Sequence, residues 1–261
     1  KALILFEILD KKTISEIKTR INLTDKEIQR WEKISNNLYI DIKDGIISQY
    51  EGFLELKEID WKKYKEKYGN IQRMDRILKA EGDSPNHYQV GKQADLLQIF
   101  WNLSVEEVKR IFSGLGYHLT DNMIKKNFRY YLKRTSHGST LSFIVHSYVA
   151  KVLGFHDIAD EMYKKALVAD YQDIQGGTTG EGIHTGLMAG TLKILLKGYL
   201  GLNPKKDHIE LDPKLKPRWD KVEFKFTFRN NDFDLKIDDN EIEINSDNLG
   251  TTQKFKVFKK E

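Results

Sequence analysis

The sequence contains no cysteine, which excludes disulfide bonds and thiolate metal sites. It also lacks any apolar run of the roughly 18 residues that a membrane-spanning helix needs, and it shows no signal peptide. Neither sign of charge dominates, because 43 basic and 39 acidic residues are interspersed along the 261 positions. A net charge of +4 distributed in this way indicates a solvated, lysine-rich surface and argues against a nucleic-acid-binding groove. We therefore expect a cytoplasmic protein with no membrane or nucleic-acid partner.

Most of the chain has the pattern of helices joined by short links. Its first residues, without an initiator methionine, read as the middle of a helix, so we expect the C-terminal part of a longer protein. Capping boxes at Thr24–Glu27 and Ser104–Glu107 indicate helix starts, and Gly154 and Gly201 suit helix ends. Apolar residues around Asp44-Gly45 predict a short hairpin. No repeat of constant period is present, so the helices are expected to close on themselves. The other helices are predicted at 60–68, 74–80, 92–103, 105–112, 121–132, 141–153, 157–169 and 182–200.

The composition changes after Asn203-Pro204, where strict alternation of apolar and polar residues replaces the helical period. This period of two, with Asn- and Asp-rich turns between the runs, predicts a half-buried antiparallel sheet. We expect residues 1–204 to be helical and residues 205–261 to form a C-terminal β domain. The strands are predicted at 222–228, 233–237, 242–244 and 255–257, with turns at 230–231, 238–240 and 248–250.

The stretch from Lys133 to Ser142 places five hydroxyls, an imidazole, two cations and a glycine in ten residues before an apolar helix. Such a helix start offers free backbone N–H groups, the positive end of the helix dipole and short hydroxyl donors, which together make an anion site without a P-loop. Ser136, Ser139 and Thr140 are all good N-cap residues, so a well-capped helix is the competing interpretation. His137 is a stronger candidate than the histidines inside the following helices.

Two other polar stretches precede predicted helices, and all three could converge at one mouth of a helical barrel. In residues 91–95, Lys92 and Gln93 are suitable ligands for sugar hydroxyls, because they offer an ammonium and an amide that both donates and accepts. Surface helix starts also carry these residue types routinely, so the pair alone is weak evidence.

The other stretch, residues 175–184, has four glycines, which are costly between two helices unless the backbone must approach a ligand. Glu181 and His184 are spaced i, i+3 and are secondary candidates for a general acid/base pair or for metal ligands. We expect no metal site, because a third ligand at suitable spacing is missing.

Three motifs in this order resemble glycoside hydrolase family 65, which holds the maltose, trehalose, kojibiose and nigerose phosphorylases. They are Gly91-Lys-Gln-Ala-Asp-Leu-Leu, the stretch Lys133 to Ser142, and Gly182-Ile-His-Thr-Gly-Leu-Met-Ala-Gly-Thr. The resemblance runs from Gln49-Tyr-Glu-Gly-Phe to the terminal β domain. The form of the glycine-rich loop, residues 175–184, looks more like that of kojibiose phosphorylases than that of maltose phosphorylases.

The resemblance implies a mostly α fold, in which part of an (α/α)6 barrel is followed by a small antiparallel β-sheet domain. The implied reaction is inverting phosphorolysis of an α-linked glucose disaccharide to glucose and β-glucose 1-phosphate, with inorganic phosphate as co-substrate and no cofactor. The family's general acid is a glutamate in an upstream Gly-Pro-Asp-Glu-Tyr type motif, which this sequence lacks. We therefore expect the chain alone to be inactive without the missing N-terminal part of the same protein, and the full-length protein to be a homodimer.

Carried over by motif, Lys92 and Gln93 match the substrate-binding pair of the donor glucose subsite, and Ser136, His137 and Ser139 match the phosphate-binding turn. A turn without a carboxylate favours the phosphorylase over the related hydrolases. Two alternatives remain open: an α-glucoside hydrolase with Glu181 as general base, and a non-catalytic carbohydrate-binding helical module.

Overall fold

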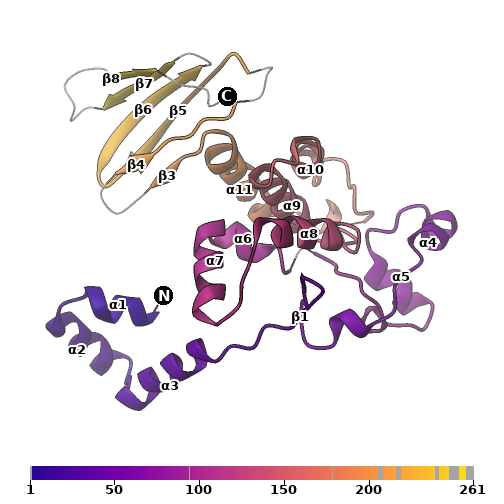
Figure 1. Cartoon of the computed structure of the whole chain (residues 1–261). Coiled ribbons are helices and arrows are strands. Elements are labelled where there is room, and N and C mark those ends of the chain that lie inside the picture. The colour runs from indigo at the N-terminus through magenta and orange to yellow at the C-terminus, as the bar shows by residue number, and fades with distance from the viewer. Residues whose placement is uncertain are drawn as a thin grey trace. The chain divides into compact units, whose positions relative to one another are not determined.

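Figure 1 shows the computed structural model of the chain, coloured from indigo at the N-terminus to yellow at the C-terminus. The chain divides into two compact units. The first unit contains residues 1–69 and 74–136, and the second contains residues 70–73 and 137–261. The division between Ser136 and His137 therefore lies inside the hydroxyl-rich turn of residues 133–142. The structure describes residues 2–93, 95–177, 179–204, 208–215, 219–238, 241–246 and 253–256.

The first unit is built from short helices and one small hairpin. Strands β1 (Ile42–Lys43) and β2 (Ile46–Ile47) pair antiparallel around Asp44-Gly45, as the sequence predicted. The reciprocal capping box of Ser104 with Glu107 is confirmed, and Thr24 accepts a hydrogen bond from the Glu27 N–H. The helices of this unit are α1 (Ala2–Ile8), α2 (Lys11–Arg20), α3 (Asp25–Asn36), α4 (Trp61–Tyr68), α5 (Met74–Ala80), α6 (Gln98–Asn102), α7 (Val105–Gly114) and α8 (Asp121–Leu132), with 3-10 turns at Phe53–Glu55 and Pro85–His87.

Helix α8, which leads into the hydroxyl-rich turn, is fixed by polar contacts to the β1–β2 hairpin. The fully buried Asn127 accepts a hydrogen bond from the Ile47 N–H at 2.8 Å and donates to the Gly45 carbonyl at 2.8 Å. The Tyr131 hydroxyl donates to the Ile47 carbonyl at 2.5 Å. Because each of these groups would be costly to bury alone, the hairpin and the end of α8 hold each other in place.

One helix prediction in this unit is wrong at its start. The helix expected at 92–103 begins only at Gln98. Before this helix, Gly91 is hydrogen-bonded to the segment that follows α8. The Gly91 N–H donates to the Arg134 carbonyl and the Gly91 carbonyl accepts from the Ser136 N–H, both at 2.8 Å. Gly91 and Thr135 thus form a parallel bridge. The other predicted helices of the first unit agree with the structure to within two residues at each end.

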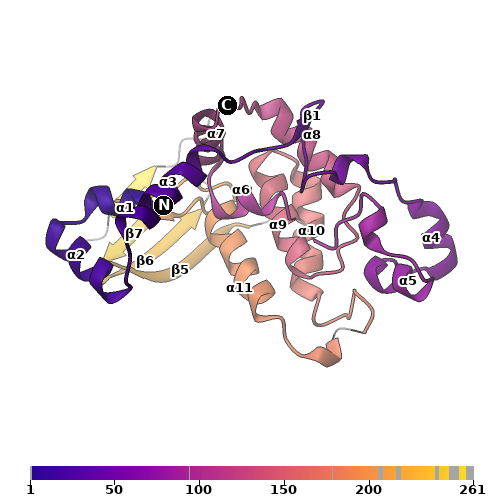
Figure 2. The same ribbon diagram turned by 90° about the horizontal axis from the view of Figure 1, so that it is seen from below.

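The helices of the second unit are α9 (Leu141–Val152), α10 (His156–Val168) and α11 (Thr185–Lys193). Helices α9 and α10 lie side by side (Figure 2), and α9 is buried along most of its length. The helix predicted at 182–200 starts later, at Thr185, and continues from Ile194 to Tyr199 as a π-helix. Across the described residues, no helix is both long and apolar enough to cross a membrane.

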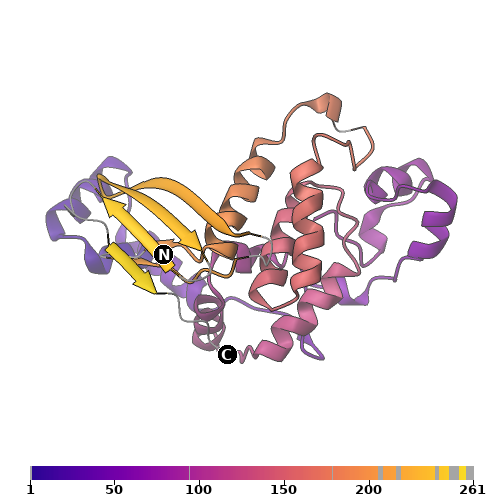
Figure 3. The same ribbon diagram turned by 90° about the horizontal axis from the view of Figure 1, so that it is seen from above.

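The C-terminal sheet has the antiparallel order β5–β6–β7–β8, as the period of two predicted; its strands are orange and yellow in Figure 3. Phe224 faces Leu235 and Val222 faces Ile237 in the β5–β6 register. Leu235, Ile237 and Ile242 are buried with Leu200 in one apolar cluster. The strands are β5 (Lys221–Phe228), β6 (Asn231–Asp238), β7 (Glu241–Ser246) and β8 (Gln253–Lys256), and a short pair joins β3 (Asn203–Pro204) to β4 (Ile209–Glu210).

The first predicted turn of the sheet lies one residue earlier than expected, because Arg229 and Asn230 connect β5 to β6 with positive φ and Asn231 already belongs to β6. Residues 239–240, 248–250 and 257, which belong to the later predicted turns and to the last strand, lie outside the described residues. So do residues 205–207, where the domain boundary was placed, and that boundary stays a prediction.

Gly201 offers a sharp test of how the helical end joins the segment before the sheet. Its φ is +60°, and a Cβ there would lie 2.3 Å from the Asp212 carbonyl oxygen. Gly154, also left-handed at a helix end, has no atom within 4 Å of the same position. We expect Gly154→Ala to lower the free energy of unfolding by about 1–2 kcal/mol from strain alone. Gly201→Ala should lower it by about 1–3 kcal/mol more. Urea unfolding of both variants measures the difference, and equal losses would contradict the contact.

Candidate functional site

The first half of the hydroxyl-rich turn is held by the bridge to Gly91. A Cβ on Gly91 would lie 3.0 Å from the Gln93 carbonyl oxygen, so a larger residue would need that carbonyl to move by a few tenths of an ångström. Ser136 is buried, and its N–H and hydroxyl both donate to the Gly91 carbonyl, at 2.8 and 3.3 Å. Both hydrogen-bond donors of Ser136 are therefore engaged by the Gly91 carbonyl. Of the predicted phosphate ligands, Ser136 is the least available.

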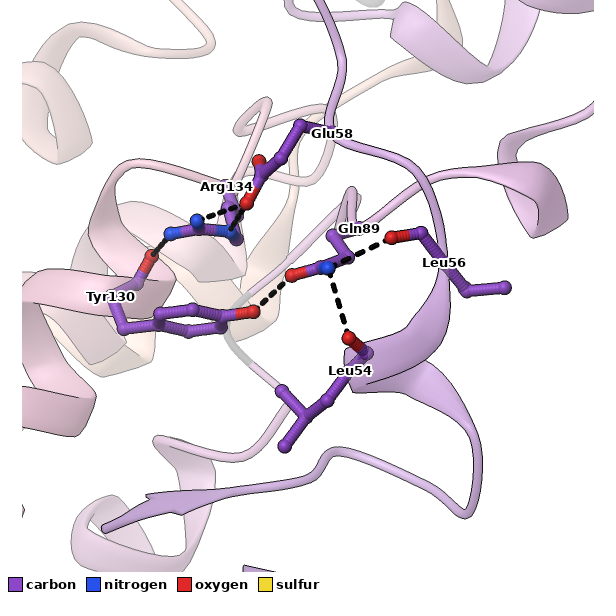
Figure 4. Close-up of polar contacts among 6 residues, drawn as sticks. All are labelled: Leu54, Leu56, Glu58, Gln89, Tyr130 and Arg134. Carbon is purple, nitrogen blue, oxygen red and sulfur yellow. Dashed lines mark hydrogen bonds and ion pairs between the residues drawn. The ribbon is translucent and has the colours of Figure 1, made fainter. Parts of the chain in front are cut away.

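Arg134, one of the two cations of the turn, is engaged within the first unit. Its guanidinium donates to the Glu58 carboxylate and, at 3.2 Å, to the Tyr130 carbonyl, and it lies over the Tyr130 ring at 3.7 Å. Beside it, the buried Gln89 donates to the carbonyls of Leu54 and Leu56 and accepts from the Tyr130 hydroxyl (Figure 4). This cluster anchors residues 54–58 to the end of α8 and leaves Arg134 as a structural cation.

Lys92 and Gln93 follow Gly91 directly, in the first unit. The Lys92 ammonium is half exposed and lies 3.9 Å from the Asp75 carboxylate. Gln93 donates through Nε2 to Asp95 at 2.8 Å, and Gln49 donates to the other oxygen of the same carboxylate at 3.2 Å. Asp95 therefore orients two amides. The role of Lys92 and of the Gln93 side-chain oxygen as ligands of sugar hydroxyls stays a prediction.

His137 begins the second unit with a left-handed backbone, at φ +57°. The buried Gln175 fixes this conformation by donating from Nε2 to the His137 carbonyl at 2.8 Å. The His137 ring stacks on Phe143 with centroids 5.2 Å apart, and its Nδ1 lies 2.9 Å from the Ser142 hydroxyl. His146 packs edge-on against the same ring at 4.9 Å. The imidazole is thus held on three sides by residues of α9 and its approach.

The capping interpretation of the turn finds no support in α9. Thr140 occupies the N-cap position and makes no side-chain capping hydrogen bond. Ser139 contributes only its carbonyl, which accepts from the Ser142 N–H at 3.0 Å. Its partly exposed hydroxyl makes no hydrogen bond to any residue that the structure describes. An incoming anion can therefore use the Ser139 hydroxyl without breaking an internal contact.

The glycine-rich loop is organised by two carboxylates rather than by its own side chains. Asp173 accepts from the N–H groups of Gly177 and Thr179, at 2.7 and 3.2 Å. Asp170 accepts from the His184 N–H at 2.8 Å and contacts its Nδ1 at 2.5 Å. In this arrangement Gly176 and Gly177 both have positive φ, which favours glycine and explains part of the glycine content of the loop.

The helical face on which Glu181 and His184 were expected to lie together is not formed, because α11 begins at Thr185 and His184 precedes it. His184 is instead paired with Asp170. Nothing is described of the Glu181 side chain, so its role stays a prediction. Among the described residues, no group of three His, Asp or Glu side chains is arranged to hold a metal ion.

Sequence reasoning missed the residues that support the three polar stretches, namely Gln49, Gln89, Asp170 and Gln175, and it missed the contact of Ser142 with His137. The i, i+4 spacing of Ser142 and His146 was a usable signal, because it places both side chains on one face of α9.

Comparison with known proteins settles the family. Residues 3–193 match the glycosyl hydrolase family 65 central catalytic domain, and residues 202–260 match the C-terminal domain of the same family. The chain belongs to glycosyl hydrolase family 65.

Relatives of this family 65 chain include an uncharacterised glycosyl hydrolase of Mycobacterium tuberculosis, 41% identical over 91% of the chain and 18% of that relative. A trehalose 6-phosphate phosphorylase of Lactococcus lactis is 41% identical over 82% of the chain and 28% of the enzyme. The chain thus spans less than a third of the length of both. A solved structure of a putative kojibiose phosphorylase from human microbiome matches 97% of the chain and 34% of its own, with a TM-score of 0.71 and 25% identity. The fold is accordingly part of the family's (α/α)6 barrel with a small C-terminal β-sheet domain.

The part-buried His137 of the turn and the fully buried His146 of α9 make stability depend on pH. Burial, with the nearby charges of His146 and Lys165, lowers the pKa of His137 from 6.5 to about 3, and burial lowers the pKa of His146 to about 4. Between these values and 6.5 the unfolded chain binds protons that the folded chain does not. The free energy of unfolding should therefore fall as the pH drops from about 6.5 to about 4.

Urea unfolding across this range measures the slope. His137→Asn with His146→Asn should flatten it, whereas the control His156→Asn, at an exposed position, should not. A wild-type slope that the double variant leaves unchanged would contradict the burial of both rings.

Proposed function

We propose that the protein of which this chain is part is an inverting phosphorylase of an α-linked glucose disaccharide. The observation that carries this proposal is the 41% identity to a trehalose 6-phosphate phosphorylase over 82% of the chain. The chemistry of the turn supports it, because residues 134–142 offer hydroxyls and a neutral imidazole and contain no carboxylate. A carboxylate at this position would repel phosphate, whereas a hydrolase needs one to activate water.

Trehalose 6-phosphate is the substrate that we favour. The identity to the phosphorylase of this compound is 41%, against 25% to the putative kojibiose phosphorylase. The kojibiose-like form of the glycine-rich loop rests on ten residues, so it weighs less than an alignment of 216 residues. The balanced reaction converts trehalose 6-phosphate and inorganic phosphate to β-glucose 1-phosphate and glucose 6-phosphate.

In this proposal the residues divide by unit. In the second unit, His137 and Ser139 donate to the phosphate that attacks the anomeric carbon, which must be held on the face opposite the leaving oxygen. In the first unit, Lys92 and Gln93 bind hydroxyls of the donor glucose. Ser136 remains a predicted ligand that would first have to release Gly91. The proton for the leaving sugar comes from a glutamate outside this sequence, and the reaction needs no cofactor.

The first test is the product of the full-length parent protein. Incubated with phosphate, it should release β-glucose 1-phosphate from trehalose 6-phosphate with a kcat/KM at least about tenfold above that for kojibiose, trehalose or maltose. A preference of this size needs only about 1.4 kcal/mol of differential binding. Enzymatic assay of glucose 1-phosphate measures it. Free glucose without glucose 1-phosphate would establish the hydrolase instead, with Glu181 as its candidate base.

The same assay tests the chain by itself. It should show no phosphorolysis, because the general acid alone is worth about 10²–10⁴-fold. Activity of the isolated chain would refute the assignment of that acid to an upstream glutamate.

The second test concerns the turn in the parent protein. Ser139→Ala with His137→Ala should raise the KM for phosphate by about tenfold or more and leave the KM for the disaccharide nearly unchanged, because both side chains contact phosphate alone. Thr140→Ala is the matched control, since it removes a neighbouring hydroxyl that makes no capping bond. Equal changes in both KM values, or a change in melting temperature only, would contradict a phosphate site.

A further inference from the structure

We propose that Ser142 and His146 are positioning residues that hold His137 in the tautomer carrying its proton on Nε2, so that this N–H faces the phosphate. The role of the Nε2–H in binding phosphate rests on the proposed function. The assignment of the tautomer rests only on contacts within the second unit.

The first step is the protonation of His146. Its Nδ1 lies 2.9 Å from the backbone carbonyl oxygen of Ser142, one turn earlier in α9. A carbonyl oxygen only accepts hydrogen bonds. The Nδ1 atom of His146 must therefore carry a hydrogen, and it serves as a donor.

The second step follows from the Ser142 hydroxyl. Its oxygen lies 3.2 Å from the same Nδ1 of His146 and 2.9 Å from Nδ1 of His137. Ser142 is fully buried, and a buried hydroxyl hydrogen needs an acceptor. Since His146 Nδ1 is a donor, the acceptor among the described residues is Nδ1 of His137.

The third step assigns the His137 ring. With Nδ1 accepting from Ser142, a neutral imidazole has its single hydrogen on Nε2. Burial supports the neutral form, because it lowers the pKa of His137 to about 3. Stacking on Phe143 and the edge contact of His146 fix the plane of the ring, and the hydrogen bond from Ser142 sets which edge carries Nδ1.

The tautomer matters because a neutral histidine presents either a donor or a lone pair at Nε2. An Nε2–H donates to a phosphate oxygen, whereas an Nε2 lone pair would repel it. The hydrogen bonds from His146 to Ser142 and from Ser142 to His137 exclude the tautomer with a lone pair on Nε2. Gln175 holds the backbone of His137 through its carbonyl. Phosphate then binds to a donor that needs no reorganisation.

Nitrogen-15 NMR of the histidine-labelled chain tests the structural part without any ligand. His137 should show an unprotonated Nδ1 and a protonated Nε2 at neutral pH. Ser142→Ala should produce a mixture of tautomers at His137. The matched control is Ser147→Ala, which removes another fully buried hydroxyl of α9, one that donates to the Ala159 carbonyl at 2.8 Å. It should leave the His137 signals unchanged. A protonated Nδ1 on His137 in the unaltered chain would overturn the inference.

Kinetics of the full-length parent protein test whether the His137 tautomer contributes to phosphate binding. Ser142→Ala should raise the KM for phosphate about tenfold, the factor that the loss of one oriented hydrogen bond supports, with kcat at saturating phosphate little changed. His146→Asn, whose amide can donate from near the Nδ1 position, should retain the KM, and His146→Leu should raise it. Ser147→Ala should leave it unchanged.

The two failures are distinguishable. If the spectra show the expected tautomer but His137→Ala does not affect the KM for phosphate, the phosphate role of the turn is wrong and the inference falls with it. If His137→Ala raises that KM while Ser142→Ala does not, the phosphate site stands and the positioning role is wrong.

Discussion

Two backbone hydrogen bonds on Gly91 are the constraint on which the candidate site depends. They join an extended segment to the chain just beyond α8, on either side of Thr135. Because a Cβ on Gly91 would crowd the Gln93 carbonyl, a larger residue at this position would require that carbonyl to shift. The bridge delays α6 until Gln98 and sets Lys92 and Gln93 beside the start of the turn. It also occupies Ser136, which leaves His137 and Ser139 as the proposed phosphate ligands of the turn.

Much of the fold could be predicted from the sequence because it is locally encoded. Helix α8 agrees with its prediction to the residue, since Thr120 caps it and its apolar residues keep the helical period. The sheet follows from strict alternation, which assigns each side chain to one face. The start of α6 could not be predicted in the same way. Its apolar pattern is helical from Lys92 onwards, and the bridge to Thr135 that overrides this pattern joins residues far apart in the chain.

In the candidate site, too, locally encoded features could be predicted and features set by distant contacts could not. The residue types of the turn were visible as an excess of hydroxyls with one imidazole, and the spacing of Ser142 and His146 was open to inspection. The left-handed backbone of His137 and its hydrogen bond from Gln175 had no local signal. The pairing of His184 with Asp170 was equally hidden, because it depends on how a glycine-rich loop folds back.

The close approach of Gly201 to Asp212 bears on how this protein can be engineered. The Leu202 N–H donates to the Leu196 carbonyl, and the Lys214 N–H donates to the Tyr199 carbonyl. The end of the helix and the segment that follows it are therefore hydrogen-bonded at several residues. Truncating the chain or fusing another domain at this junction would break these contacts. A chimaera that exchanges β domains between family members would keep its native fit only if the crossover lay upstream of α11, carrying the last helix together with its sheet.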